Sequence, residues 1–492
     1  MASLVANGCK LLRGTRPGVG LNKLGSRYLG KQLLEQAKKS TQQVGVKHRP
    51  FSSHQNNINL VNELIDNGVA GEASLGIGKY IAGAEVIWPC QVGAGDSITQ
   101  NRSFQRAVLE NIDDALKGTV DPFSYGNEMP QTKENMKTYI QKLTPQSIDW
   151  TRWDVSLSNG LKTSLQTILM LGKIFVEKDL PTLVAFANSY PPTVNAALMQ
   201  GYNLKLVPFA LNQDGSVDIS ESIDRYCNAA QSADIGLLET VNPMGINIPT
   251  EFNEKITNVL NSSPIGLVIG DFAYPEVGAK LQNNPLLDLD KPVVNAYTIS
   301  KMAGRAPGAR ISPLMCNDET FLSLLKASCF SSTPGLSEVA FNTIVDDGFL
   351  DKNLEQAHKP FEHAGKLADL INKSPILKDH GISAINPDHG GFVRVRSVIT
   401  SPVDVQEQFV AHTENRYGKT EAIGVVTAEQ MALAHQLYNQ SIPPEYENEP
   451  RLDNELRLGA FKLDNEDFSG ERLIEAMIDK FSHFSESAVL KM

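Results

Sequence analysis

The chain is poor in cysteine, and its cysteines are not clustered. Five cysteines occur in 492 residues, and no two of them form a C-x-x-C pair. Disulfide frameworks and cysteine-based metal sites both need such clustering, so the sequence indicates a reducing compartment and predicts no metal site. The histidines agree with this, because His358 and His363 are five residues apart, a spacing that does not place two metal ligands together.

Long apolar runs are also missing. No segment is apolar over the length that a membrane-spanning helix requires, so we expect a soluble protein with no membrane partner. The glycine-rich turns at Gly76–Gly78 and Gly93–Gly95 do not complete G-x-G-x-x-G between a strand and a helix, which excludes the nicotinamide-binding fingerprint. What remains is an ordinary globular composition, 41% hydrophobic and 21% charged, in a chain long enough for two domains.

Acidic residues are nearly absent from the start of the chain. Residues 1–62 contain ten Lys or Arg and one acid, Glu35. Such a lead is typical of a mitochondrial transit peptide, and Arg49-Pro50-Phe51-Ser52-Ser53 resembles a matrix-processing site. A disordered basic arm with no targeting role fits the same residues. The expected location is therefore the cytoplasm, or the mitochondrial matrix if the lead (residues 1–58) is a transit peptide.

The rest of the chain has the opposite charge. Because the whole chain has a net charge of −11, the residues after position 62 carry −20. An acidic body repels the phosphates of nucleic acids, so we expect no nucleic-acid partner.

Strand and helix patterns alternate regularly from about Trp153. Short β-branched strands separated by helical stretches predict a mainly parallel sheet with helices on both faces. From about Asp347 a long helix over Leu354–Ile371 and two alternating strands, Gly390–Arg396 and Glu455–Phe461, predict a smaller α/β domain. We therefore divide the chain into the lead 1–58, an N-terminal arm 59–120 that joins the small domain in part, a large domain 121–346 and a small domain 347–492.

Polar residues follow three of the predicted strands of the large domain. They occur as Asn242-Pro243-Met244-Gly245, as Asp271-Phe272-Ala273-Tyr274 and as Thr298-Ile299-Ser300-Lys301. Ligands of open α/β sheets bind beyond the carboxyl ends of the strands, so these groups can converge. A lysine at the end of a buried strand is costly unless it is neutralised, paired or used covalently. With hydroxyls before it and arginines after it, this lysine suits Schiff-base chemistry beside an anchored phosphate, as in pyridoxal phosphate (PLP) enzymes.

Together, the Asn-Pro-x-Gly, Asp-x-x-Tyr and Ser-Lys segments resemble the fold-type I PLP enzymes, specifically the class I/II aminotransferase family. The resemblance extends from about Val92 to Phe481, most of the chain. It implies an α/β fold in which a large domain holds a mainly parallel, seven-stranded sheet between helices, next to a smaller C-terminal α/β domain. It also implies PLP as the cofactor, an amino acid and a 2-oxo acid as substrates, and a homodimer.

The resemblance assigns roles around the cofactor ring. Lys301 would form the Schiff base and move the proton of the substrate Cα, and Asp271 would pair with the ring nitrogen and keep it protonated. Tyr274 and Asn242 would donate hydrogen bonds to the ring oxygen. Tyr190 resembles the aromatic residue that stacks on the ring, although a core tyrosine fits the same pattern.

Other residues match the family positions that hold the phosphate and the substrate carboxylate. The residues expected around the phosphate are Gly160, Leu161, Lys162, Thr298, Ser300 and Arg310, with Tyr125 reaching in from the neighbouring subunit. The lysine-to-arginine spacing is one residue longer than usual, so Arg305 competes with Arg310. Arg457 corresponds to the arginine that grips the α-carboxylate, and Gly95 belongs to the glycine turn that lies against it.

We therefore predict a PLP-dependent aminotransferase. A lyase, decarboxylase or synthase of the same fold uses the same carbanion chemistry and is the alternative, because fold does not select the reaction. A non-catalytic homologue is a third reading, against which Lys301, Asp271 and Tyr274 together argue. The sequence leaves the amino-donor and oxo-acid specificity open.

Overall fold

The computed structural model describes residues 85–88, 102–118, 129–385, 392–398, 413–414, 420–427 and 441–459, except for short gaps at 275, 278–279, 282, 302, 307–308, 330–333, 424 and 450–451. All of these belong to one unit, residues 56–492. The predicted transit peptide, the glycine turn with Gly95, and Tyr125 lie outside the described residues. The domain boundaries stay a prediction.

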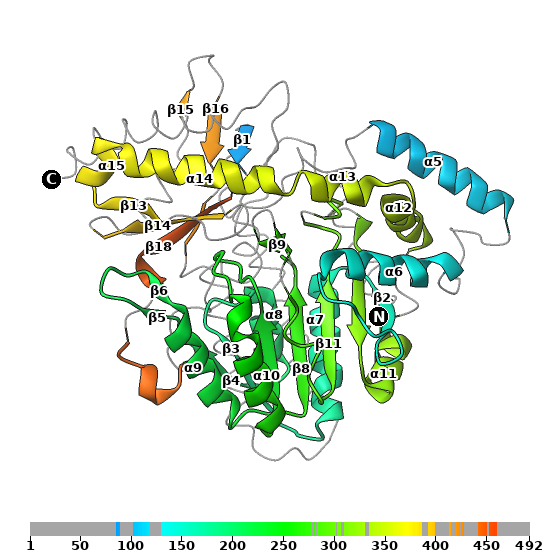
Figure 1. Ribbon diagram of the computed structural model, residues 1–492, viewed down its shortest axis with the longest axis horizontal. Coiled ribbons are helices and arrows are strands. Elements are labelled where there is room, and N and C mark those ends of the chain that lie inside the picture. Colours follow the sequence, from blue (N-terminus) through cyan, green and yellow to red (C-terminus); the bar gives the residue numbers. More distant parts are fainter. Residues whose placement is uncertain are drawn as a thin grey trace, which may run out of the picture. The chain divides into compact units, whose positions relative to one another are not determined.

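The central element is a seven-stranded sheet with the strand order β2-β12-β11-β8-β7-β3-β4 (Figure 1). Its strands are β2 (Asp154–Ser158), β12 (Ser312–Cys316), β11 (Val293–Tyr297), β8 (Leu267–Phe272), β7 (Ile235–Glu239), β3 (Thr182–Phe186) and β4 (Asn203–Val207). Strand β12 is antiparallel to both of its neighbours, and every other pair is parallel. The prediction of a mainly parallel, seven-stranded sheet is confirmed.

Helices cover both faces of this sheet, because its strands are apolar on both faces. One face packs against α7 (Leu161–Phe175), α8 (Pro191–Met199) and α11 (Glu319–Cys329). The other packs against α6 (Pro130–Leu143), α9 (Ile219–Ala230), α10 (Asn253–Ser262) and α12 (Gly335–Asp346), and α5 (Arg102–Lys117) lies against α12.

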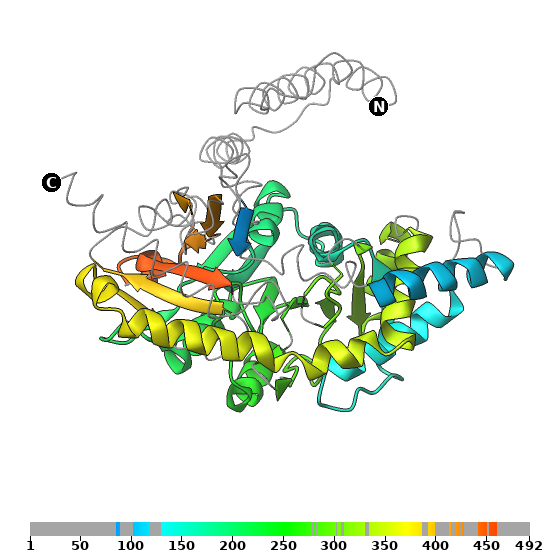
Figure 2. The same ribbon diagram turned by 90° about the horizontal axis from the view of Figure 1, so that it is seen from above.

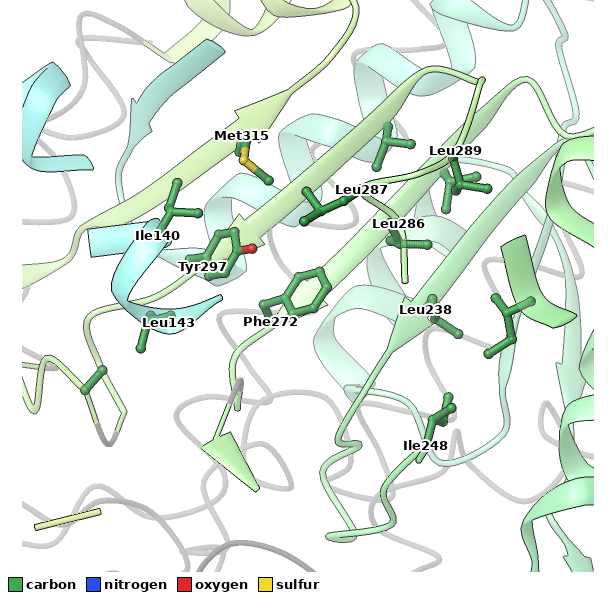
Figure 3. Packing of buried hydrophobic residues seen from close by; sticks show 14 of the residues in the cluster. Ile140, Leu143, Leu238, Ile248, Phe272, Leu286, Leu287, Leu289, Tyr297 and Met315 are labelled. Atoms are coloured by element: carbon green, nitrogen blue, oxygen red, sulfur yellow. The ribbon is translucent and has the colours of Figure 1, made fainter. Parts of the chain in front are cut away.

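Along β8 the two faces alternate residue by residue. Leu267 and Ile269 point to the face covered by α7, whereas Val268 and Phe272 point to the other. On that second face the rings of Phe272 and Tyr297 stack with centroids 5.1 Å apart (Figure 3). By the same period of two, Asp271 at the end of β8 belongs to the face covered by α7.

A second, four-stranded sheet is antiparallel throughout, in the order β13-β14-β18-β17. It contains β13 (Ile382–Ile385), β14 (Phe392–Ser397), β18 (Glu455–Gly459) and β17 (Val425–Thr427), and it packs against α14 (His358–Lys373) and α15 (Pro375–Asp379). Figures 1 and 2 show β14 and β18 side by side with α14 along them. Both predicted strands of this region therefore exist.

The predicted long helix Leu354–Ile371 is wrong in its continuity. The structure has two helices there, α13 (Phe349–Glu355) and α14, which are separated at Gln356 and Ala357. Pro360 explains the break, because its ring nitrogen cannot donate to the carbonyl of residue 356 and proline is tolerated only in a first helical turn. The pattern of apolar residues continues across Gln356 and Ala357, so it does not indicate the break between the two helices.

Smaller pairings complete the described part. Strand β1 (Glu85–Trp88) is parallel to β16 (Thr420–Ile423), which also pairs with β15 (Thr413–Glu414). Two short hairpins are β5 (Ala210–Leu211) with β6 (Val217–Asp218) and β9 (Glu276–Val277) with β10 (Lys280–Leu281). The 3-10 helices are η4 (Thr250–Phe252), η7 (Pro444–Tyr446) and η8 (Leu452–Asn454). Of the helices described, none has the length and apolarity to cross a membrane.

Candidate active site

The predicted site residues gather at one edge of the central sheet. Strands β2, β3, β7, β8 and β11 run in the same direction, so their carboxyl ends share this edge. Strand β12 runs the opposite way and therefore begins there. The segments that reach the edge carry Gly160, Leu161, Lys162, Tyr190, Asn242, Asp271, Tyr274, Thr298, Ser300, Lys301 and Arg310. Along the sequence these residues lie as many as 150 positions apart.

Lys301 lies beside the two residues predicted to act with it. Its Nζ is 5.3 Å from the centroid of the Tyr274 ring. Asp271 is 3% exposed, and one of its carboxylate oxygens accepts a hydrogen bond from the Ala273 amide at 3.0 Å. Burial raises the pKa of Asp271 far above its usual range, while that hydrogen bond and the positive charge of Lys301 lower it. The lysine thus supplies positive charge to a carboxyl that the sheet has removed from water.

A tight backbone turn holds Lys301 in place. The Arg305 amide donates to the Lys301 carbonyl at 2.6 Å, and the Ala306 amide donates to the Ile299 carbonyl at 2.8 Å. Gly304 approaches the Ile299 backbone so closely that a Cβ would overlap it. Thr298, just before, is fixed on both sides, because Tyr139 donates to its carbonyl at 2.9 Å and its own hydroxyl accepts from the Ser300 amide at 3.1 Å.

Asn242 is a buried amide whose N–H donor can bind a group in the site. Its Oδ1 accepts from the Met244 amide at 2.9 Å and from the Ile246 amide at 3.1 Å, which fixes the orientation of the side chain. Its Nδ2 is buried and has no hydrogen-bond partner among the described residues. Met244 points away, fully buried in the core on the α6 side, so its backbone alone contributes to the turn. The group that Asn242 presents to the site is therefore an N–H donor.

The first turn of α7 and Arg310 form a corner rich in donors. Gly160, which caps α7, has φ +77°, and its Cα approaches the Arg310 guanidinium: a Cβ there would lie 2.5 Å from Nη2. The first amides of a helix have no acceptor within the helix. The Leu161 side chain is buried in the core, and Lys162 is exposed, so both contribute backbone to this corner.

The same corner is tied to the Lys301 segment. Strand β12 follows Arg310, and its Ser312 pairs with Ser158 at the end of β2 while its hydroxyl donates to the Tyr297 carbonyl at the end of β11. Thr298 and Ser300 therefore enter the edge next to the α7 terminus. Arg310 has a left-handed backbone, with φ +53°, which is uncommon for a residue with a side chain and is typical of functional sites. Arg305 has the same backbone conformation, with φ +51°.

Tyr190 stands between these groups. It caps α8 directly after β3, and its ring packs on the core of the α7 side. Burial raises the pKa of its phenol, and the charges of Tyr274 and Asp271 raise it further. Arg310 and Arg457 lower the pKa. Tyr190 is thus close enough to Asp271 and to Arg310 for the charges of both to act on its phenol.

Arg457 comes from the small sheet and docks onto the Asn242 turn. It is 5% exposed, its Nη1 donates to the Pro243 carbonyl, and its guanidinium lies 4.4 Å from the centroid of the Phe392 ring. Phe392 in turn meets the edge of the Tyr274 ring, with centroids 5.1 Å apart. The contacts run without interruption from Lys301 through Tyr274 and Phe392 to Arg457.

Sequence reasoning missed Phe392 and Glu239. The sequence places Phe392 inside the alternating strand Gly390–Arg396, and the two glycines before it are the local signal that this strand approaches another segment closely. Glu239 was treated as part of a strand, although a lone acid in the apolar run Gly236-Leu237-Leu238 is unusual. Glu239 is 3% exposed, lies opposite Asp271 in the β7–β8 pairing, and accepts from the Tyr190 amide at 2.9 Å.

Two predicted residues, Tyr125 and Gly95, lie outside the described part of the chain, so their placement stays a prediction. Within the described residues, no three His, Cys, Asp or Glu side chains are grouped as a metal ion would need.

Comparison with known proteins finds this fold among solved aminotransferases. No protein-family model matches the sequence, and a search of curated proteins finds no significant match. Among solved structures, kynurenine aminotransferase from Pyrococcus horikoshii matches with a TM-score of 0.58 at 13% identity, over 92% of this chain and 99% of that one. Aspartate aminotransferase from Thermus thermophilus matches with a TM-score of 0.57 at 15% identity, over 77% of this chain and 87% of that one.

Alanine aminotransferase from Pyrococcus furiosus matches with a TM-score of 0.56 at 16% identity, over 78% of this chain and 88% of that one. At these identities the likeness concerns the fold, since few individual residues are shared. The chain therefore has the fold of these aminotransferases, with the strand ends that carry Asn242, Asp271 and Lys301 at one edge of its central sheet.

Proposed function

We propose that the chain is a PLP-dependent aminotransferase that moves an amino group between an amino acid and a 2-oxo acid. The observation that carries the proposal is the meeting of a lysine, a buried carboxyl and a donor-rich helix start at one sheet edge. Lys301, Asp271 and the α7 terminus beside Arg310 supply these three features. That they do so in a fold found in aminotransferases supports the same conclusion.

The residues fit PLP at each of its polar groups. The ring-facing end of the site, formed by Asp271, Asn242 and Tyr274, offers a buried acid for a ring nitrogen that carries a proton. The unpartnered Nδ2 of Asn242 offers a donor for the ring oxygen. The phosphate-facing end, formed by Gly160, Arg310 and the first turn of α7, offers backbone amides and a guanidinium for a dianion.

We assign the phosphate to Arg310 rather than Arg305. The Arg310 guanidinium lies against Gly160, at the helix terminus where amides are available. Thr298 and Ser300 would complete this end with hydroxyl and backbone donors. Leu161 and Lys162 would contribute amides only, which explains how these side chains can differ from the small or hydroxyl residues usual at such positions.

When bound, PLP supplies an aldehyde that exchanges amino groups and a ring that takes up the electrons of a substrate C–H bond. The protein would move the proton: the Lys301 amine would act as the base that takes the proton from the substrate Cα and as the acid that returns it. Asp271 would keep a proton on the ring nitrogen, because a carboxylate removed from water stabilises a nearby cation strongly. Tyr274 and Asn242 would donate to the ring oxygen, and Tyr190 would pack against the ring.

Arg457 would hold the substrate α-carboxylate. A guanidinium matches a carboxylate with two parallel hydrogen bonds, which a lysine cannot do. The contacts with the Pro243 carbonyl and the Phe392 ring aim it at the Asn242 turn, next to Tyr274. We also propose a homodimer in which Tyr125 reaches the partner's phosphate and Gly95 lies beside the carboxylate.

The test is a chemical map of the cofactor. Purified protein incubated with PLP should absorb visible light, borohydride should remove that band, and peptide mapping should place the adduct on Lys301. The variant Lys301→Ala should lose the adduct, whereas Lys366→Ala, an exposed lysine on α14, should keep it. An adduct on another lysine would refute the assignment. A screen of amino donors against 2-oxo acids, scoring ammonia release as well, then separates an aminotransferase from a lyase.

A further inference from the structure

The β7–β8 pairing places two acids next to each other in the sheet interior. Glu239 and Asp271 are Cα partners in parallel strands, so their backbones are about 4.8 Å apart and their side chains project from the same face. Both are 3% exposed. The α7 face of the sheet, which is otherwise built of aliphatic side chains such as Leu237 and Ile269, therefore ends in a pair of buried carboxyls.

Each carboxyl has its own surroundings. Asp271 faces the charge of Lys301 and accepts from the Ala273 amide. Glu239 faces Asp271 on one side and the β3–α8 turn on the other, where Ser189 and the Tyr190 amide donate to it. Asp271 thus has a cation nearby, and Glu239 has an anion.

Two buried anions at this separation repel each other strongly, so the pair favours holding one proton. The surroundings decide which acid keeps it. Burial and the charge of Asp271 both raise the pKa of Glu239, and its neutral donors lower it only in part. The second oxygen of Glu239, Oε2, is buried without a partner among the described residues, which costs less on a neutral acid than on a carboxylate.

We propose that Glu239 is a positioning residue that stays protonated: it anchors the Tyr190 turn to β7 and leaves Asp271 as the single anion at the ring-facing end. The proposal rests on the proposed function, because the cation that Asp271 meets is the cofactor ring. Glu239 acts through Asp271 and Tyr190, and is not itself a group that touches the reacting atoms. An ionised Glu239 would be a second anion beside Asp271 and would compete with it for the positive charge of the ring.

The first experiment compares two substitutions that separate charge from hydrogen bonding. Glu239→Gln keeps a neutral acceptor for the Tyr190 amide, so PLP affinity should stay within about threefold of wild type. Glu239→Ala leaves that buried amide without an acceptor, so the affinity should fall about tenfold. Glu338→Gln is the matched control, because Glu338 is also a buried acid that accepts two hydrogen bonds, from the Met129 amide and the Thr132 hydroxyl, and it should leave PLP affinity unchanged.

The second experiment needs no cofactor and therefore separates this proposal from the proposed function. It compares infrared spectra of the cofactor-free, full-length wild type and of Glu239→Gln at neutral pH. The carbonyl stretch of protonated carboxyls should be weaker in Glu239→Gln by the contribution of one carboxyl. If wild type forms no adduct at Lys301, the proposed function fails while this readout still reports on Glu239.

Three results would overturn the proposal. Glu239→Gln could bind PLP as weakly as Glu239→Ala, which would mean that the negative charge of Glu239 matters. Glu239→Ala could bind like wild type, which would leave Glu239 with no positioning role. Wild type and Glu239→Gln could show equal absorption by protonated carboxyls, which would mean that Glu239 is ionised in the folded protein.

Discussion

The ring-facing end of the candidate site is buried within the central sheet, whereas the phosphate-facing end lies at the surface of the protein. Asp271 is 3% exposed and is enclosed by β7, β8 and the Lys301 segment, while Arg310 is exposed beside the first turn of α7. The interior end depends on formal charges and their protonation. The surface end depends on backbone amides, whose dipoles are the same at every pH.

This difference explains why the interior end needs neighbouring groups that stabilise its charge, whereas the surface end does not. A charge inside the sheet has little water to stabilise it, so Asp271 needs Lys301, the Ala273 amide and a neutral neighbour. At the surface, water and a helix terminus already stabilise an anion, and a single arginine suffices. Variants at the interior end should therefore change chemistry and pH dependence, and variants at the surface end should change affinity.

The largest effect is expected from Asp271→Asn. The amide is nearly isosteric but cannot stabilise a protonated ring nitrogen, so turnover should fall roughly 100-fold or more while PLP stays bound. Steady-state rates and the visible spectrum of the bound cofactor measure the two quantities separately. Near-normal turnover would mean that Asp271 has a purely structural role.

A smaller effect is expected from Gly160→Ala, which attacks the surface end. The new Cβ would push Arg310 away and would strain a backbone with φ +77°, so PLP affinity should fall roughly tenfold with little change in turnover at saturating cofactor. Gly348→Ala is the control, since Gly348 has φ +73° but no atom within 4 Å of the Cβ position. It should cost stability and leave affinity intact. Equal losses of affinity in both variants would trace the effect to backbone strain alone.

The smallest expected effect is a change of folding stability with pH, and only the acids of the interior end should cause it. Burial raises the pKa of Asp271 and of Glu239, so the folded, cofactor-free protein binds more protons than the unfolded chain above the ordinary carboxyl range. This contribution to stability is complete below about pH 4 and is lost as the pH rises through neutrality. Denaturant unfolding between about pH 5 and pH 8 should show the decline.

Two variants sharpen this third prediction. Asp271→Asn should reduce the decline by more than half, because one of the two acids is gone and the other, Glu239, no longer has its pKa raised by the Asp271 charge. Gly160→Ala should lower stability by the same amount at each pH, since no titrating group changes its surroundings. A decline that Gly160→Ala abolishes would contradict the assignment of pH dependence to the interior end.

Much of the fold could be predicted from the sequence, because each strand of the central sheet is a short apolar run bounded by turn residues. The regular alternation of strands and helical stretches from about Trp153 predicted the mainly parallel sheet with helices on both faces. The break between α13 and α14 was not predicted, since the apolar period continues across it. Sheet order and the antiparallel direction of β12 were also not predictable from periodicity, which carries no information on pairing.

The sequence by itself determined which residue types stand at the strand ends: an amide, an acid with a phenol, and a lysine between hydroxyls and arginines. These are local features, set by where an apolar run stops. Tertiary structure alone decided that Glu239 lies beside Asp271, that Arg310 rather than Arg305 reaches Gly160, and that Phe392 joins Tyr274 to Arg457. Those facts depend on strand register and on the docking of one sheet upon a turn of another, and contacts between residues 32 to 150 positions apart leave no local pattern in the chain.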